Sequence, residues 1–216
     1  MRNPEFESFI SVFGEATYTT EVPETSLEKY RGILPDKLLL YWKEEGWSAY
    51  GNGLFWTVNP EEFEGVLSMW LEHTGISDID AYHVFARTAF GNLIVWGQNT
   101  NQYFTIDSPI HKIFLDKDKL EKSEFDPEVS IGGFFILSEK EDYDLENDSG
   151  EFMFERVLDR CGVLTEGEMY AFEPALALGG TSSIENISKA PILAHLAVLS
   201  QLAPIEIVGY DTSSCV

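Results

Sequence analysis

Cationic side chains are scarce in this sequence of 216 residues. It has 14 Lys and Arg residues against 37 Asp and Glu residues, which gives a formal net charge of −23 at pH 7. No two of the cationic residues are adjacent. Because nucleic acids and anionic lipids are bound through clustered cations that neutralise phosphates, this composition argues against both as direct partners. The same negative field would attract a cationic protein and raise its association rate.

Long apolar runs and cysteines are also scarce. No stretch approaches the roughly 18 consecutive apolar residues that a membrane helix needs, and residues 1–5 lack the basic-then-apolar layout of a signal peptide. The two cysteines are Cys161, in a helix-like stretch, and Cys215, next to the C-terminal residue. A disulfide framework is therefore not expected, which is typical of a reducing compartment. We expect a cytoplasmic protein that contacts no membrane.

Few residues have the spacing of a catalytic or metal site. The four histidines include no HExxH motif and no neighbouring cysteine pair, so the sequence predicts no metal, no cofactor and no enzyme. His83 and His111 fall in different predicted strands and could be neighbours. His195 lies in a very apolar helix, where a neutral core histidine bonded to the backbone is favoured. The glycine-rich segments 50–56 and 177–183 lack a phosphate-loop pattern and are interpreted as turns.

Helix starts are well marked, because several cap residues are followed directly by proline. Asn3, Asn59 and Asp126 are such N-caps, and Thr25 and Thr165 begin Thr-x-x-Glu patterns of the kind that also start helices. The hydrophobic fraction of 44% is enough for a packed core. We expect helices at residues 4–13, 26–33, 36–46, 60–72, 127–137, 151–161 and 189–202.

Strand-like segments are concentrated between residues 82 and 115, where "YHVFART", "NLIVWG", "QYFTID" and "IHKIFL" are separated by turn formers. They predict an antiparallel meander, to which "GLFWTV" could add an edge strand. "MYAFEPAL" and "IEIVGY" would form a second, smaller β element. The sequence thus predicts an α+β fold, with an antiparallel β meander packed with helices and a smaller, mostly helical C-terminal lobe with short strands. The expected domains are 1–118 and 119–216, which can pack as one unit.

An acidic run extends from Glu139 to Glu151, with seven carboxylates and one lysine. Charge runs are commonly solvated loops, but this run also contains Tyr143 and Leu145 as possible anchors, and the net charge exceeds what solubility requires. An anchored acidic surface is typical of protein recognition. The predicted partner-binding residues are Glu139, Glu141, Asp142, Tyr143, Asp144, Glu146 and Asp148, with a second patch at Glu44, Glu45 and Trp47.

Two parts of the chain resemble known protein families. "LPDKLLLYWKEEGWSAYGNGLFWTVNPEEFE" and "YHVFARTAFGNLIVWG" are similar to the GAD-like domain of bacterial type VI secretion immunity proteins. "MYAFEPALALGG" and "APILAHLAVLSQLA" resemble the C-terminal domain that accompanies it in immunity proteins of secreted DNase toxins. The resemblance implies a cytoplasmic antidote that binds a cognate basic nuclease toxin, and it brings no catalytic residues.

Two alternatives remain open from the residues. "LPDKLLLYWKEEGW" followed by "LFWTV" is also similar to the SUKH superfamily, which would imply immunity to a toxin of another activity. The aromatic content of the meander would also suit a small-molecule-binding or enzymatic domain.

Overall fold

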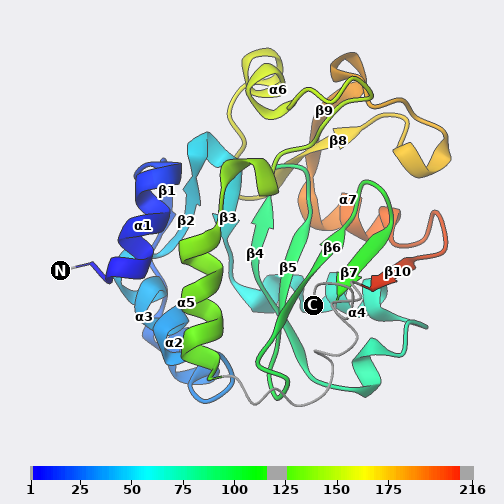
Figure 1. The fold of residues 1–216 in the computed structure, drawn as a ribbon. Coiled ribbons are helices and arrows are strands. Elements are labelled where there is room, and N and C mark those ends of the chain that lie inside the picture. Colours follow the sequence, from blue (N-terminus) through cyan, green and yellow to red (C-terminus); the bar gives the residue numbers. More distant parts are fainter. Residues whose placement is uncertain (1, 116–125, 210–216) are drawn as a thin grey trace, which may run out of the picture.

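The computed structural model describes residues 2–115 and 126–209 (Figure 1). In this part of the chain the helices are α1 (Pro4–Phe13), α2 (Glu24–Tyr30), α3 (Asp36–Glu45), α4 (Pro60–Leu71), α5 (Pro127–Leu137), α6 (Phe154–Cys161) and α7 (Ile192–Leu199). The strands are β1 (Tyr18–Thr20), β2 (Trp47–Tyr50), β3 (Phe55–Thr57), β4 (Tyr82–Thr88), β5 (Leu93–Gly97), β6 (Tyr103–Asp107), β7 (Lys112–Leu115), β8 (Glu168–Phe172), β9 (Ile187–Pro191) and β10 (Glu206–Gly209).

One large sheet dominates the molecule. Its strand order is β1-β2-β3-β4-β5-β6-β7-β10, and every neighbouring pair is antiparallel except β7 and β10. The predicted α+β fold and its antiparallel meander are confirmed. The meander forms because β-branched and aromatic residues alternate with short turns, so that each strand pairs with the next one along the chain.

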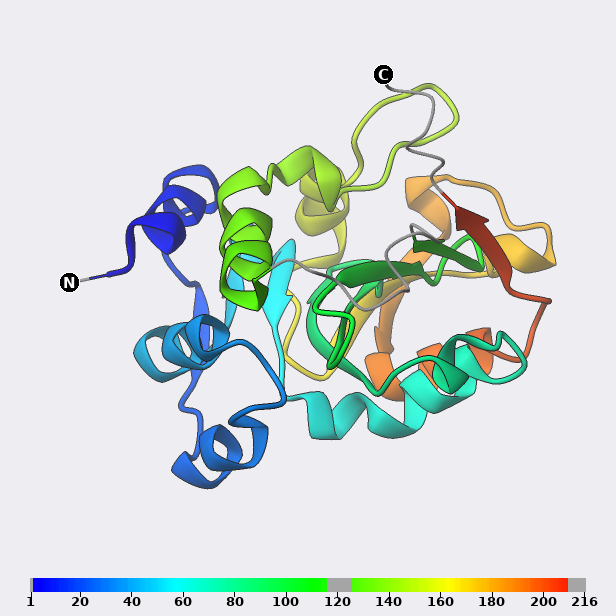
Figure 2. The same ribbon diagram turned by 60° about the horizontal axis from the view of Figure 1, so that its bottom comes forward.

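Helices cover both faces of the large sheet. On one face α5 packs between α1 and α3, while α4 and α7 lie on the other face (Figure 2). Aromatic side chains pack these three helices together. The ring of Phe9 in α1 lies 5.4 Å from that of Phe135 in α5, and the ring of Phe6 in α1 lies 4.7 Å from that of Tyr41 in α3. On the second face Trp70 Nε1 donates to the carbonyl of Leu196 at 3.1 Å.

The strand expected at the sheet edge is instead an interior strand. β3 pairs with β2 on one side and with β4 on the other, and Phe55, Trp56 and Thr57 are all buried. The prediction was wrong because β1 and β2 were not recognised as strands. "WSAY" and "YTT" are too short to show an alternating pattern, so their pairing could not be read from local sequence.

The second β element also differs from the prediction. β8 pairs with β9, whereas β10, expected there, adds to the large sheet, where the Glu206 amide donates to the His111 carbonyl at 3.0 Å. β9 occupies the start of the helix expected at 189–202, and α7 begins only at Ile192. The choice of partner strand depends on tertiary contacts, which local propensity does not report.

The cap-plus-proline helix starts are confirmed, but the Thr-x-x-Glu starts are wrong. The Asn3, Asn59 and Asp126 side chains each accept a hydrogen bond from the backbone amide two residues later. α2 begins at Glu24, one residue before Thr25. Thr165 begins a turn before β8, in which its amide donates to the Glu168 carboxylate at 2.8 Å. A capping pattern therefore also suits an isolated turn.

The domain boundary predicted at residues 118 and 119 lies outside the described residues, as does Cys215. The division into two domains stays a prediction. Two elements from the second half of the chain lie against the first half, since α5 packs on α1 and β10 pairs with β7.

Candidate partner-binding surface

The acidic segment, residues 139–151, leaves the end of α5 and runs toward α6 (Figure 1). It starts with a single 3₁₀ turn, η4 (Lys140–Asp142), in which the Glu139 amide donates to the Asp142 carboxylate at 3.0 Å. Five of the seven predicted contact residues in this segment have exposed side chains: Glu139, Glu141, Asp142, Glu146 and Asp148. The segment thus presents carboxylates on an ordered backbone.

Tyr143 is not an exposed anchor, contrary to expectation. Its side chain is 8% exposed, and its ring lies 4.9 Å from the ring of Phe55. Its hydroxyl lies 2.6 Å from Ser138 Oγ, and burial raises the pKa of the phenol. Tyr143 therefore fastens the acidic segment to the core. The alternation of polar and aromatic residues could not distinguish an inward-facing tyrosine from an outward-facing one.

Asp144 also has a structural role. Its carboxylate accepts hydrogen bonds from the amides of Leu145 at 2.7 Å and Phe154 at 2.9 Å, and so caps the start of α6. Burial raises the pKa of this carboxyl, although the amide donors oppose the shift. Its negative charge is therefore turned toward the protein's own backbone. Leu145 is partly buried against the core as well.

The second predicted patch lies at the other end of β2 from the acidic segment. Glu44 is exposed, whereas the Glu45 side chain is 14% exposed and accepts from Arg2 Nε at 2.7 Å. Trp47 is half-buried, with its ring 5.9 Å from that of Trp42. β2 runs from Trp47 to Tyr50, and Gly51, the next residue, faces the Lys140 side chain. The structure therefore does not merge the two patches.

The histidines lie apart from one another. His83 packs edge-on against Tyr30, with ring centroids 5.8 Å apart. His111 Nε2 lies 2.6 Å from the carbonyl of Leu199, so this histidine is the one that bonds to the backbone. His195 is half-buried, and burial lowers the pKa of its imidazole. Within residues 2–115 and 126–209, no group of three His, Cys, Asp or Glu side chains could hold a metal ion.

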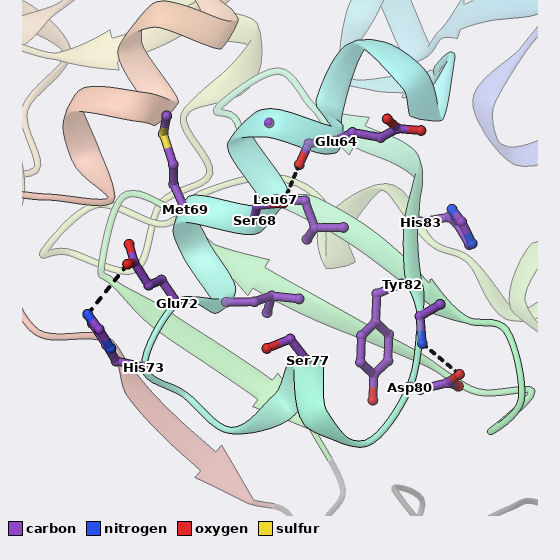
Figure 3. A pocket seen from close by; sticks show the side chains of 13 residues that line it. Glu64, Leu67, Ser68, Met69, Glu72, His73, Ser77, Asp80, Tyr82 and His83 are labelled. Carbon is purple, nitrogen blue, oxygen red and sulfur yellow. Dashed lines mark hydrogen bonds and ion pairs between the residues drawn. The ribbon is translucent and has the colours of Figure 1, made fainter.

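An open groove of about 890 Å³ lies between α4 and the start of β4 (Figure 3). The groove was not predicted from the sequence. The polar residues Glu64, Ser68 and Glu72 recur every four residues, but this spacing is typical of the solvent-facing side of any amphipathic helix and does not indicate a groove. A 3₁₀ turn, η2 (Ile76–Asp78), closes one end of the groove.

Two polar side chains of the groove, Ser68 and Asp80, are hydrogen-bonded to the protein's own backbone. Ser68 Oγ donates to the carbonyl of Glu64 at 2.9 Å. The Asp80 carboxylate accepts from the amides of Asn99 and Thr100, each at 2.8 Å. Burial alone would raise the pKa of Asp80, but these hydrogen bonds outweigh it and lower the pKa. Asp80 therefore fixes the turn between β5 and β6.

Comparisons with family models identify the family of the chain. A model of the GAD-like domain matches residues 4–110, and a model of the T6SS immunity protein Tdi1, C-terminal, matches residues 129–203. The chain belongs to the GAD-like type VI secretion immunity proteins. The predicted family is confirmed, and membership implies a cognate toxin as the partner.

The fold of this immunity protein is shared with a solved structure. The crystal structure of Atu4351 from Agrobacterium tumefaciens superposes with a TM-score of 0.83 at 21% sequence identity, covering 97% of this chain and 94% of that chain. No curated protein matches the chain. In the described part of the immunity protein, no helix is both long and apolar enough to cross a membrane.

The two candidate patches fall in different family segments. The exposed carboxylates of the acidic segment lie within the Tdi1-type region, while Glu44, Glu45 and Trp47 lie within the GAD-like region. The groove of Figure 3 is also in the GAD-like region.

Proposed function

We propose that this immunity protein neutralises a cognate DNase toxin in the cytoplasm by covering the toxin's basic DNA-binding surface. The observation that carries the proposal is the acidic segment, where six of the seven carboxylate residues are exposed. A DNase must present cations to the phosphates of its substrate, so a protein with the opposite charge can occupy the same surface.

The anchoring of this segment supports the proposal. Tyr143 is buried in the core and the neighbouring Asp144 accepts from the first amide of α6, so two consecutive residues fasten the acidic segment to the rest of the protein. An ordered surface loses less conformational entropy on binding, which favours the tight complex that an antidote needs. Glu44 and the exposed edge of Trp47 would supply a second, more distant contact.

Inhibition in this proposal is stoichiometric and involves no catalysis by the immunity protein. The groove of Figure 3 contains Ser68 and His83, but the Ser68 hydroxyl donates to the carbonyl of Glu64 in its own helix and not to His83. An activated nucleophile would need a base within hydrogen-bond reach.

The test is co-purification with the product of the adjacent toxin gene, followed by a DNA degradation assay. We expect one equivalent of immunity protein to abolish cleavage and to displace a fluorescent DNA duplex from a cleavage-inactive toxin. A complex that still binds the duplex would contradict occlusion of the DNA-binding surface. A toxin that spares DNA but has another activity would favour the SUKH-type alternative.

The volume of the groove favours small-molecule binding as a second candidate function. At about 890 Å³ it lies within the range of roughly 300 to 1,000 Å³ typical of ligand pockets. A thermal-shift screen of metabolites tests this function. A saturable shift that Ser68→Trp abolishes would support it, and the absence of any shift would count against it.

A further inference from the structure

A small hollow lies beside the acidic segment, where α5 ends. It measures about 210 Å³, and its walls come from β5, β6, α5 and η4. Tyr103 and Phe134 form an aromatic wall, with ring centroids 5.0 Å apart. Leu137 stands at the mouth with 76% of its side chain exposed, and Tyr103 is 42% exposed. Large apolar side chains are thus left open to solvent next to a strongly acidic turn.

Asp142 lies at the rim of the same hollow. Its carboxylate accepts a hydrogen bond from the Glu139 amide at 3.0 Å, which fixes its position in the turn. Partial burial, followed by the nearby negative charge of Asp142, raises the pKa of the Tyr103 phenol. Glu139 and Glu141, on either side of Lys140 in the same turn, are also exposed.

We propose that this hollow receives an arginine side chain of the cognate toxin, an inference that rests on the proposed function. The hollow is smaller than the roughly 300 Å³ at which pockets for whole ligands begin, so it suits a single side chain. Arginine matches both features of the site. Its aliphatic stem packs on Leu137, while its guanidinium stacks on the Tyr103 ring and meets the Asp142 charge.

The arrangement also explains how an acidic surface can bind tightly. Exposed carboxylates alone contribute mainly to the association rate and are screened by salt. A partly desolvated arginine anchor, surrounded by contacts that exclude water, slows dissociation. The acidic segment then attracts the toxin, and the hollow retains it.

The test uses two immunity-protein variants, Leu137→Arg and Asp142→Asn, in kinetic binding to a cleavage-inactive toxin. Leu137 is so exposed that the substitution leaves the core intact, and asparagine can still accept the Glu139 amide. We expect each variant to dissociate roughly ten-fold faster or more, as for loss of a binding hot spot. Val198→Arg, at a position 55% exposed on α7, is the matched control and should change the rate little.

A double-mutant cycle then identifies the partner residue. Each arginine and each lysine of the toxin is replaced in turn by alanine and combined with Asp142→Asn. One arginine should show strong non-additivity with Asp142, because each substitution removes the same contact. Additive effects at every arginine, or coupling to a lysine instead, would overturn the assignment.

If both variants bind and inhibit normally while the wild-type protein still blocks DNA cleavage, the hollow is excluded but the proposed function stands. If the wild-type protein fails to block cleavage, the proposed function itself is wrong.

Discussion

The hydroxyl groups of Ser138 and Tyr143 lie 2.6 Å apart inside the protein, and Ser138 Oγ also donates to the carbonyl of Phe134 at 2.7 Å. This pair joins the last turn of α5 to the acidic segment. Tyr143, which the sequence suggested as a contact for the partner, therefore helps to hold the exposed carboxylates of this segment in place.

Substitution of Tyr143 should affect stability more than recognition. Tyr143→Phe keeps the ring and removes one buried hydrogen bond, which should cost roughly 1 kcal/mol of unfolding free energy. Tyr143→Ala leaves a cavity beside Phe55 and should cost about 3 to 5 kcal/mol. Urea unfolding measures both values. Tyr103→Phe is the control, because Tyr103 is 42% exposed and the loss of its hydroxyl should stay within about 0.5 kcal/mol. Equal effects of Tyr143→Phe and Tyr103→Phe would contradict the anchoring role.

Charge reversal of the exposed carboxylates should slow toxin association. The triple variant replaces Glu141, Glu146 and Asp148 by Lys. Its acidic segment no longer attracts a basic toxin electrostatically, so we expect the association rate at low salt to fall roughly ten-fold or more. Its dependence on salt concentration should also flatten. Stopped-flow fluorescence at several salt concentrations measures both effects.

The matched control reverses three other exposed carboxylates, Glu21, Glu24 and Glu28, which lie in and just before α2. It changes the net charge by the same amount but leaves the acidic segment intact. Equal slowing in both triple variants would show that net charge acts rather than this surface. Unchanged kinetics in the first variant would leave residues 139–151 as a solvated loop.

Asp107 should make stability depend on pH. Burial raises the pKa of this carboxyl to about 6, although the Ile110 amide and Lys112 oppose the shift. Because the folded pKa exceeds the unfolded value of about 3.9, the stability contributed by the protonated form is complete below about pH 4 and is lost as the pH rises through 6. Asp107→Asn should therefore stabilise the protein at pH 7 by about 1 to 3 kcal/mol, with little effect at pH 4.

Chemical denaturation at pH 4, 5, 6 and 7 measures this difference between variant and wild type. Asp78→Asn is the control, since Asp78 is exposed and its replacement should give a flat difference. A variant that is less stable than the wild type at pH 7 would refute the assignment.

Glu128 should stabilise a helix to which it does not belong. Its carboxylate accepts from the amides of Asp36 at 2.8 Å and Lys37 at 2.7 Å, and so caps the start of α3 from α5. Pro35, the residue at the N-cap, makes no side-chain cap of its own. Glu128→Ala should cost roughly 1 to 2 kcal/mol, as for loss of an N-cap.

Thermal or urea unfolding tests the Glu128 variant against Glu7→Ala. Glu7 makes only an exposed ion pair with Arg2 at 3.5 Å, so its removal should cost less than about 1 kcal/mol. A Glu128 variant no less stable than the Glu7 variant would contradict the cap.

The sequence by itself determined the features that depend on neighbours along the chain. Asn3, Asn59 and Asp126, each followed by proline, marked the starts of α1, α4 and α5, because a cap acts within a few residues. The meander from Tyr82 to Leu115 was equally local, since each strand pairs with the next. The family resemblance and the excess of negative charge were also visible in the sequence.

Tertiary structure alone decided which side chains of the acidic segment are exposed to solvent. Tyr143 and Asp144 lie among exposed carboxylates in the sequence, yet one enters the core and the other turns to cap α6. The place of β10 beside β7, and the meeting of Tyr103, Leu137 and Asp142 around one hollow, join residues far apart along the chain. Such contacts form only when the whole fold buries enough apolar surface to offset the entropy of ordering the chain, so no local pattern reports them.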